Sequence, residues 1–398
     1  MIRNDRCLPE GRARIFPVQI FMAFLRLGLT SFGGPTMVAY IRELAVKKRQ
    51  WLSDESFADG VALCQAIPGA TAMQTAAYAG FRAAGPLGAL AAFVGFGLSA
   101  FILMVILSAL YQKTRDFGPV ISAFHGLHVI VVAMIANATL NFGRSSIKNI
   151  QDSLLAAGAA VFLGSHGSPI VAVLAAAALG LLLYGKDMDK ILSAHSPKIH
   201  EDTDKPSRFP IVFALAVVIG VAALSFVNHG LFRLATVMMK VDLFAFGGGF
   251  ASVPLMYHEV VDARHWMDGK TFMDGIALGQ VTPGPIVITA TFVGYQIRGI
   301  TGAIIGTIGI FSPSFFMVTA AIPYFDRLQN SLLFRRALRG ILVSFVGLLL
   351  AVTLHFARAV SWTFPAVVLS GMAFTALRLK VDILWVVLFG ALVSVAVL

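Results

Sequence analysis

Long apolar segments occupy most of this sequence and restrict the environments in which it can fold. They run for about 15 to 26 residues, which suits helices that cross a hydrocarbon layer roughly 30 Å thick. The chain is 58% hydrophobic and only 13% charged, whereas a soluble domain usually carries roughly a quarter charged residues. The segments lack the alternating pattern of an outer-membrane barrel. We therefore expect an all-α integral membrane protein.

Two kinds of break interrupt the apolar segments, and each kind occurs twice. Glycine runs stand at residues 33–34 and 247–249, and a Gln-x-x-Pro-Gly motif follows each of them, at residues 65–69 and 280–284. Proline lacks the amide hydrogen and collides with the preceding turn, while glycine permits the bent backbone that results. A helix interrupted inside a membrane leaves free N–H groups that lipid cannot satisfy. The breaks are therefore where we look for a function.

The two halves of the chain match each other in register, which indicates an internal duplication. Gly33 matches Gly247 at a separation of 214 residues, and Gln65 matches Gln280 at 215. One inserted residue explains the difference. The further matches at 215 residues join Trp51, Phe57, Asp59, Pro68 and Gly69 to Trp266, Phe272, Asp274, Pro283 and Gly284.

Charge indicates that the two halves are inverted relative to each other. Basic residues mark the cytoplasmic side of a membrane protein. The loop at residues 42–49 contains four of them, whereas the equivalent loop of the second half has only Arg264. The bias reverses further on, where residues 327–339 of the second half are the more basic. We expect two inverted-topology repeats, each with two broken or re-entrant helix pairs plus spanning helices. The sequence leaves open whether the broken segments are re-entrant or bent.

The same patterns predict the division and the location of the chain. We expect a first transport domain at residues 1–185, a hydrophilic cytoplasmic linker at 186–209 and a second, inverted domain at 210–398. The expected location is a bacterial plasma (inner) membrane, crossed many times. The net charge of +11 lies mostly in loops between apolar spans, so we expect a bilayer and no nucleic acid as partner. A homodimer is left open.

The four breaks predict an anion site. Interrupted helices of inverted repeats often meet around the solute in secondary transporters. A helix N-terminus carries about half a positive charge, so four of them would supply about +2, which suits a doubly charged oxyanion. Arg26 and Lys240 precede the glycine breaks and would either face this anion or snorkel to an interface. The candidate substrate-binding residues are Arg26, Ser31, Gly33, Gly34, Pro35, Thr36, Gln65, Pro68, Gly69, Thr71, Lys240, Gly247, Gly248, Gly249, Gln280, Thr282, Pro283, Gly284 and Pro285, with further donors at Gln74, Thr75, Ser252 and Thr289.

Four acidic residues are candidates for carrying coupling protons: Asp59, Asp274, Glu43 and Glu259. The two aspartates occupy equivalent positions, shortly after the tryptophans of the two repeats. That placement also suits a hydrated helix start, which is the competing interpretation. For the breaks, the competing interpretation is close helix packing, because Gly and Pro are common in membrane helices.

No motif points to catalysis or to a cofactor. His125 and His128 share a helix face, but a metal site would need further ligands, so we expect them to pack as polar side chains. His-Glu-x-x-His and Gly-x-Ser-x-Gly motifs are absent from the sequence. We therefore expect neither an enzyme nor a bound cofactor or metal. A membrane scaffold without transport is the remaining alternative, and the matched glutamines in apolar segments argue against it.

The motifs resemble a known family. Phe-Gly-Gly-Pro at residues 32–35, Trp-Leu at 51–52 and Leu-Cys-Gln-Ala-Ile-Pro-Gly at 63–69 resemble the signature of the chromate ion transporter (CHR) family. The second half echoes it at residues 246–250 and 280–285. The chain is similar to the long form of the family, and this resemblance implies antiparallel homologous domains in a bacterial plasma membrane. It also implies efflux of chromate, a structural analogue of sulfate, with chromate resistance and coupling to protons.

Two positions depart from the family pattern. Ala70 stands where the family usually has a second proline, and Val38 stands where many members have a histidine. These departures put the solute and the coupling in question. Our hypothesis is a secondary active transporter that exports chromate or a similar divalent tetrahedral oxyanion by alternating access. The alternative within transport is uptake or exchange of sulfate or another small anion.

Overall fold

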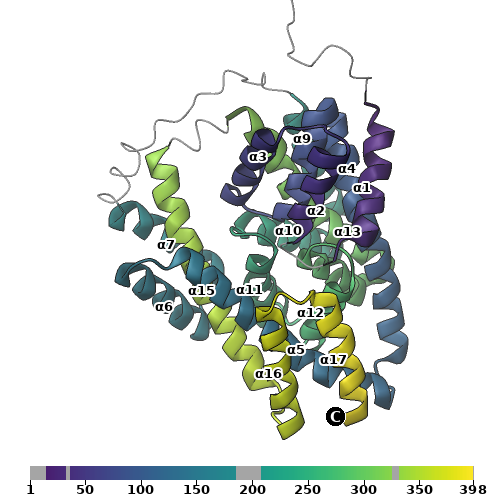
Figure 1. Ribbon diagram of the computed structural model, residues 1–398, viewed down its shortest axis with the longest axis vertical. Coiled ribbons are helices and arrows are strands. Elements are labelled where there is room, and N and C mark those ends of the chain that lie inside the picture. Colours follow the sequence, from purple (N-terminus) through teal and green to yellow (C-terminus); the bar gives the residue numbers. More distant parts are fainter. Residues whose placement is uncertain (1–14, 33–35, 185–207, 325–330, 398) are drawn as a thin grey trace, which may run out of the picture.

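The computed structural model describes residues 15–32, 36–184, 208–324 and 331–397, and every regular element in them is a helix (Figure 1). This confirms the expected all-α fold. Among the described residues, five helical runs are long and apolar enough to cross a membrane. They are Thr71–Thr114, Gly118–Ser146, Phe209–Val227, Ile286–Tyr324 and Leu332–Ala359.

The same order of elements occurs twice along the chain. In the first half, the described elements are α1 (Pro17–Thr30), α2 (Thr36–Arg42), the π-helix η1 (Glu43–Lys48), α3 (Asp54–Ala66), α4 (Thr71–Thr114), α5 (Gly118–Ser146), α6 (Ile150–Gly164) and α7 (Pro169–Leu183).

The second half begins with one additional helix and then repeats this order. The linker expected at residues 186–209 lies outside the described residues, apart from its last two. The described elements are α9 (Phe209–Val227), α10 (His229–Phe244), the 3₁₀-helix η2 (Gly249–Ala251), α11 (Ser252–Tyr257), the π-helix η3 (His258–Asp262), α12 (Gly269–Val281), the 3₁₀-helix η4 (Ile286–Ile288), α13 (Thr289–Ala321), the 3₁₀-helix η5 (Ile322–Tyr324), α15 (Leu332–Ala359), α16 (Phe364–Arg378) and α17 (Ile383–Val397).

The duplication extends to the irregular turns of the backbone. Both π-helices end in the same way, because the amide of Trp51 donates to a carbonyl six residues earlier at 2.7 Å and that of Trp266 does so at 2.9 Å. The two longest helices also bend at the same place. Gly85 in α4 has φ +66° and its counterpart Gly299 in α13 has φ +59°. The internal duplication inferred from matched residues is therefore present in the fold.

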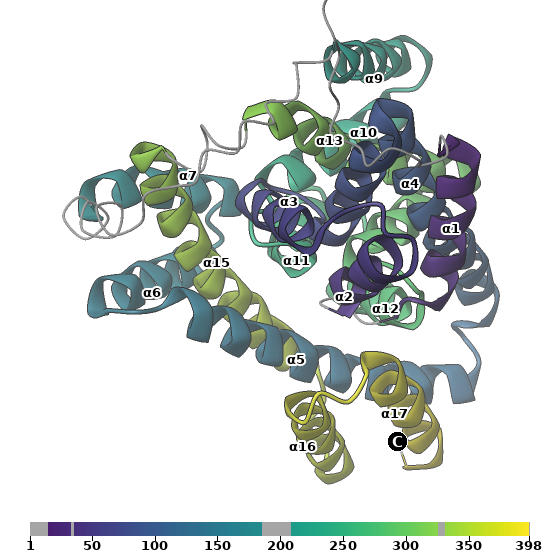
Figure 2. The ribbon, with the colours of Figure 1, turned by 45° about the horizontal axis from the view of Figure 1, so that its top comes forward.

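The two repeats exchange their last helix pairs. Helices α6 and α7 of the first repeat pack against α15 of the second, while α16 and α17 of the second pack against α5 of the first (Figures 1 and 2). Helices α5 and α15 also pack against each other, as do α4 and α13. Small residues allow the close contact, since a Cβ at Gly340 would lie 2.1 Å from the Ala176 carbonyl oxygen. Neither repeat buries its apolar surface alone.

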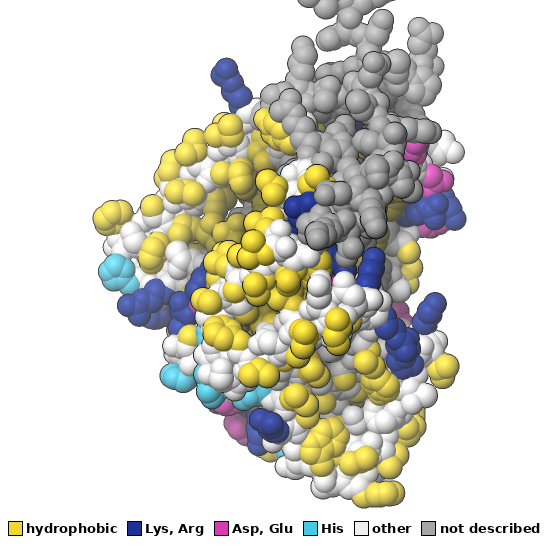
Figure 3. Space-filling model, turned by 90° about the vertical axis from the view of Figure 1, so that its left-hand side faces the viewer, with side chains coloured by type: hydrophobic (Ala, Val, Ile, Leu, Met, Phe, Trp, Pro, Cys, Tyr) yellow, Lys and Arg dark blue, Asp and Glu magenta, His cyan; other side chains and the backbone are white. Residues whose placement is uncertain are grey.

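The outer surface is apolar to an extent that suits lipid. In Figure 3, apolar side chains spread over much of the visible face, and Lys and Arg side chains stand in separate groups. Leu182 on α7 is 79% exposed and Phe226 on α9 is 91% exposed. Such a surface would be costly in water. It agrees with a chain that is embedded in a membrane.

Candidate functional site

Three of the four breaks meet in the interior of the molecule, and they come from both repeats. The amide of Gly69, in the first repeat, donates a 2.9 Å hydrogen bond to the carbonyl oxygen of Ala245 in the second repeat. A Cβ atom at Gly249 would lie 2.9 Å from Cγ2 of Ile286, so the two breaks of the second repeat also touch. The fourth break, at residues 33–35, lies outside the described residues.

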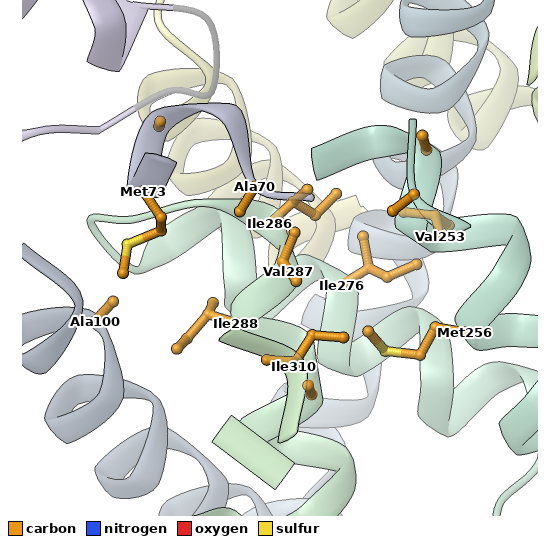
Figure 4. Packing of buried hydrophobic residues seen from close by; sticks show 14 of the residues in the cluster. Ala70, Met73, Ala100, Val253, Met256, Ile276, Ile286, Val287, Ile288 and Ile310 are labelled. Atoms are coloured by element: carbon orange, nitrogen blue, oxygen red, sulfur yellow. The ribbon is translucent and has the colours of Figure 1, made fainter. Parts of the chain in front are cut away.

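We call this meeting place the break junction; its described part consists of residues 67–71, 245–249 and 282–288. Figure 4 shows apolar side chains from both repeats around it, among them Ala70 and Val287. Each of these two residues is only 1% exposed. The centre of the break junction is therefore buried, while residues at its edge such as Thr71 and Gly247 are partly exposed.

Glycine is required at two points of the break junction. Gly69 has φ +116°, and a Cβ there would lie 2.0 Å from Oγ of Ser314. Gly248 has φ +93°, and a Cβ there would lie 3.1 Å from Oγ1 of Thr71. Residues with a side chain rarely adopt positive φ. The two repeats can approach this closely only because these positions carry no side chain.

The backbone amide of Ala70, just before the start of α4, has an acceptor within the protein. The Ala70 amide donates to Oγ of Ser314 at 3.0 Å, and the Ser314 hydroxyl donates to Oδ1 of Asp242 at 3.0 Å. The side-chain amide of Gln74 donates to the Pro68 carbonyl oxygen at 2.6 Å. An anion that used the Ala70 amide would have to displace Ser314 first.

The departure at Ala70 has a physical reason. A proline there would have no N–H to donate to Ser314. At the equivalent place in the second repeat the chain has Pro285, and the residue equivalent to Ser314 is Ala100. The proline therefore occupies a position at which no side-chain hydroxyl is present to accept a hydrogen bond from a backbone amide.

Three of the hydroxyl groups expected to extend the donor set bond to nearby backbone carbonyl groups instead. The hydroxyl of Ser31 donates to the Leu27 carbonyl oxygen at 2.7 Å, and that of Thr282 donates to the Gly279 carbonyl oxygen at 2.8 Å. Thr36 likewise donates to the carbonyl oxygen four residues earlier, at 2.9 Å. These hydroxyls satisfy local carbonyl groups in the closed arrangement.

The two motif glutamines lie in different environments. Gln280 is buried and Gln65 is exposed. The brace of the first-repeat break is Gln74, through its bond to Pro68. The sequence placed Gln74 only among the further donors, whereas Gln65 was a candidate substrate-binding residue and has no such contact among the described residues.

The two basic residues near the glycine breaks also differ. Arg26 is exposed. The ammonium of Lys240 donates to Oε1 of Glu259 at 2.8 Å, and Arg264 pairs with the other oxygen of the same carboxylate. Glu259 is only 3% exposed, so its charge is balanced by both cations. Lys240 is therefore engaged in an ion pair.

Of the four acids considered for proton coupling, Asp274 has the most elaborate surroundings. It is buried, and its two oxygens contact the first repeat: the Tyr111 hydroxyl donates to Oδ2 at 2.7 Å, and Nε2 of His128 lies 2.6 Å from Oδ1. Its counterpart Asp59 is half-buried and has no such pair among the described residues. Glu43 makes a 3.5 Å ion pair with a lysine one turn later and is half-buried.

Asp242 is the residue that sequence reasoning missed. It is completely buried in α10, and it belongs to none of the duplicated motifs. A signal was available, because an ionisable residue inside an apolar membrane segment is by itself a functional candidate. The sequence analysis named Lys240, two residues earlier, as a candidate instead. His128, interpreted as polar packing, proves to be the partner of Asp274.

Two hollows among the described residues lie outside the break junction. A groove of about 400 Å³ between α6 and α7 is lined by apolar side chains such as Leu155 and Ala176. A second, of about 350 Å³, lies between α4, α9 and α13 and is lined by residues such as Phe93 and Phe315. Their apolar walls suit lipid chains and offer nothing to an anion. Among the described residues, no cluster of three His, Cys, Asp or Glu side chains could hold a metal.

A duplicated helical membrane protein whose interrupted helices meet between its two repeats has the architecture of a secondary transporter. Comparison with family models agrees with this class. The model described as chromate transporter matches residues 18–181 and 232–395, which is most of both halves. The chain belongs to the chromate transporter family, as its motifs indicated.

Several curated relatives match along most of the chain. An uncharacterized transporter of Methanocaldococcus jannaschii is 45% identical over 397 residues, covering 99% of this chain and 98% of the relative. The chromate transport protein of Cupriavidus metallidurans is 30% identical over 316 residues, covering 78% and 75%. The chromate transport protein of Pseudomonas aeruginosa is 29% identical over 408 residues, covering 94% and 91%. No solved structure matches the chain.

Proposed function

We propose that this membrane transporter exports chromate, or a similar divalent tetrahedral oxyanion, across a plasma membrane by alternating access between two inverted repeats. The observation that carries the proposal is the meeting of three breaks from both repeats in one buried place. Membership of the family and the names of two relatives support the solute class. The proposed direction of transport, export, rests on the resemblance of the motifs to the family signature.

The proposed anion ligands are backbone amides at the break junction. The Gly248 amide has no acceptor among the described residues, and its α-carbon faces the hydroxyl of Thr71 across the repeat boundary. An oxyanion placed here would receive N–H and O–H donors from both repeats, close to the start of α4. Separation of the Gly69–Ala245 contact would free one further N–H donor, that of Gly69. The closed arrangement would then be one state of the transport cycle.

The domain division remains part of the proposal. We assign residues 1–185 and 210–398 to the two transport domains, joined by the linker at 186–209. The exchange of helix pairs supports a shared transport unit, because α5 and α15 each carry helices of the other repeat. Of the four acids considered for coupling, Asp274 is the one buried against the opposite repeat.

Chromate flux in vesicles tests the proposal. Purified protein in liposomes should move chromate faster than empty liposomes, with sulfate as a competitor, and gradients applied in each direction should show export to be favoured. Gly248→Leu should abolish this flux, because a side chain at φ +93° would collide with Thr71. Gly158→Leu is the control, since nothing lies near its Cβ position. If chromate, sulfate, molybdate and bicarbonate are all inert, the proposal is wrong.

A further inference from the structure

A carboxyl group without a counter-charge lies against the break junction. Asp242 in α10 is 0% exposed. Its Oδ1 accepts a hydrogen bond from the Ser314 hydroxyl at 3.0 Å, and its Oδ2 has no partner among the described residues. An ionised carboxylate in such a place lacks both water and a cation. Burial of that kind is costly unless the group is paired or neutral.

The elements packed against Asp242 supply no charge to pair with it. Helix α10 contacts α13, α9 and α11. Neither α9 nor α11 contains a Lys, Arg, Asp or Glu residue. In α13 the only such residue is Arg298, whose guanidinium lies beside Gly230 at the opposite end of α10. On α10 itself, Lys240 is paired with Glu259, and Arg233 is exposed nine residues before Asp242.

The surroundings also exclude an anion at this carboxyl group. Two buried acceptor atoms near the break, Oδ2 of Asp242 and Oε1 of Gln74, lack a hydrogen-bond partner within the described part of the chain. Both residues contact the same short segment: Gln74 through Pro68, and Asp242 through Ser314 and the Ala70 amide. Acceptors repel an oxyanion and attract a hydrogen. A proton on Asp242 would give this side chain a donor of its own at this point.

The equivalent contact on the other side of the pseudosymmetric junction shows that packing does not need this acid. The residues that match Asp242 and Ser314 are Gly28 and Ala100. The approach is equally close there, because a Cβ at Gly284 would lie 2.6 Å from that of Ala100. One junction thus contains a carboxyl group, a hydroxyl and an amide in series, and its counterpart contains none of them.

We propose that Asp242 is a proton-binding site that couples proton movement to the opening of the break junction, an inference that rests on the proposed transport function. One proton binds Oδ2 from water on one side of the membrane and leaves to water on the other. The neutral acid is compatible with the closed junction described here. Loss of the proton leaves a charge that needs water, which favours separation of Ser314 from the Ala70 amide.

The test compares driven transport with exchange in liposomes that contain the full chain. Asp242→Asn keeps the size of the side chain and cannot release a proton. We expect this variant to lose the part of chromate flux that depends on a pH gradient, while exchange at equal pH on both sides continues. Ser314→Ala keeps the acid, so it should shift the pH dependence without abolishing it. Full pH-gradient-driven flux in Asp242→Asn would overturn the inference. So would a result in which only Asp274→Asn loses the pH-gradient-driven flux. Flux that is driven by a sodium gradient and not by a pH gradient would also overturn it.

An independent measurement does not need transport. Infrared spectra of the purified protein should show the C=O stretch of a protonated carboxylic acid at neutral pH, and this band should be missing from Asp242→Asn. Identical bands in both proteins would contradict the inference, whatever the flux. If the wild-type protein moves no oxyanion, the proposed solute is wrong, and the infrared result still decides whether Asp242 holds a proton.

Discussion

Replacement of Gly69 by alanine isolates the contact that holds the two repeats together at the break junction. The added Cβ would lie 2.0 Å from Oγ of Ser314 and 2.7 Å from Nε2 of Gln74. Positive φ costs a residue with a side chain about 1–3 kcal/mol, and overpacking adds about 1–3 kcal/mol. We therefore expect Gly69→Ala to lower the free energy of unfolding by about 2–6 kcal/mol.

Gly85→Ala is the matched control, because Gly85 also has positive φ, at +66°, but nothing lies within 4 Å of its Cβ position. It should cost only the backbone part, about 1–3 kcal/mol. The assay is reversible unfolding of the purified protein in detergent, followed by its intrinsic fluorescence. A double variant, Gly69→Ala with Ser314→Ala, should recover part of the loss, because the colliding oxygen is gone. If Gly69→Ala unfolds no more easily than Gly85→Ala, the contact with Ser314 is not what Gly69 provides.

Two further variants test the polar pairs that join the repeats. His128→Gln should destabilise the protein by about 1–3 kcal/mol, since it removes the 2.6 Å contact of the imidazole with the buried Asp274 carboxyl group. Asp59→Asn at the equivalent half-buried position should change stability by less than about 0.5 kcal/mol, and equal losses in the two variants would refute the assignment. Arg339→Met should cost about 3–5 kcal/mol, because its guanidinium lies 3.0 Å from the buried Asp152, and an unchanged melting temperature would show that the pair is dispensable.

The local features of the fold could be predicted from the sequence because their causes are local. Breaks occur where Pro and Gly disrupt a helix, and Trp51 and Trp266 mark equivalent turns. The separation of 214 residues between the repeats also relates Gly85 to Gly299, and in the structure a helix is kinked at each of these two glycines. The exchange of helix pairs was not predictable, because apolar segments such as α6 and α16 do not specify which long helix covers them.

The polar contacts at the candidate site were harder to predict than the breaks. The pairing of Lys240 with Glu259 depends on a π-helix, which changes the direction of the side chains after residue 257. The contact of Asp242 with Ser314 joins residues 72 positions apart. Neither has a fixed spacing in sequence. Motif spacing identified the place where the backbone is interrupted but not the side chains that fill it.

The exchanged helix pairs also have a consequence for biosynthesis. Helices α6 and α7 leave the ribosome well before α15, the helix that covers them, has been made. Until then their inner faces have only lipid or an insertion chaperone to contact. The first repeat therefore cannot complete its tertiary structure during its own translation, and the late, long-range docking of α15 becomes a slow step of assembly. The two repeats of this transporter therefore complete their packing together, after α15 has been synthesised.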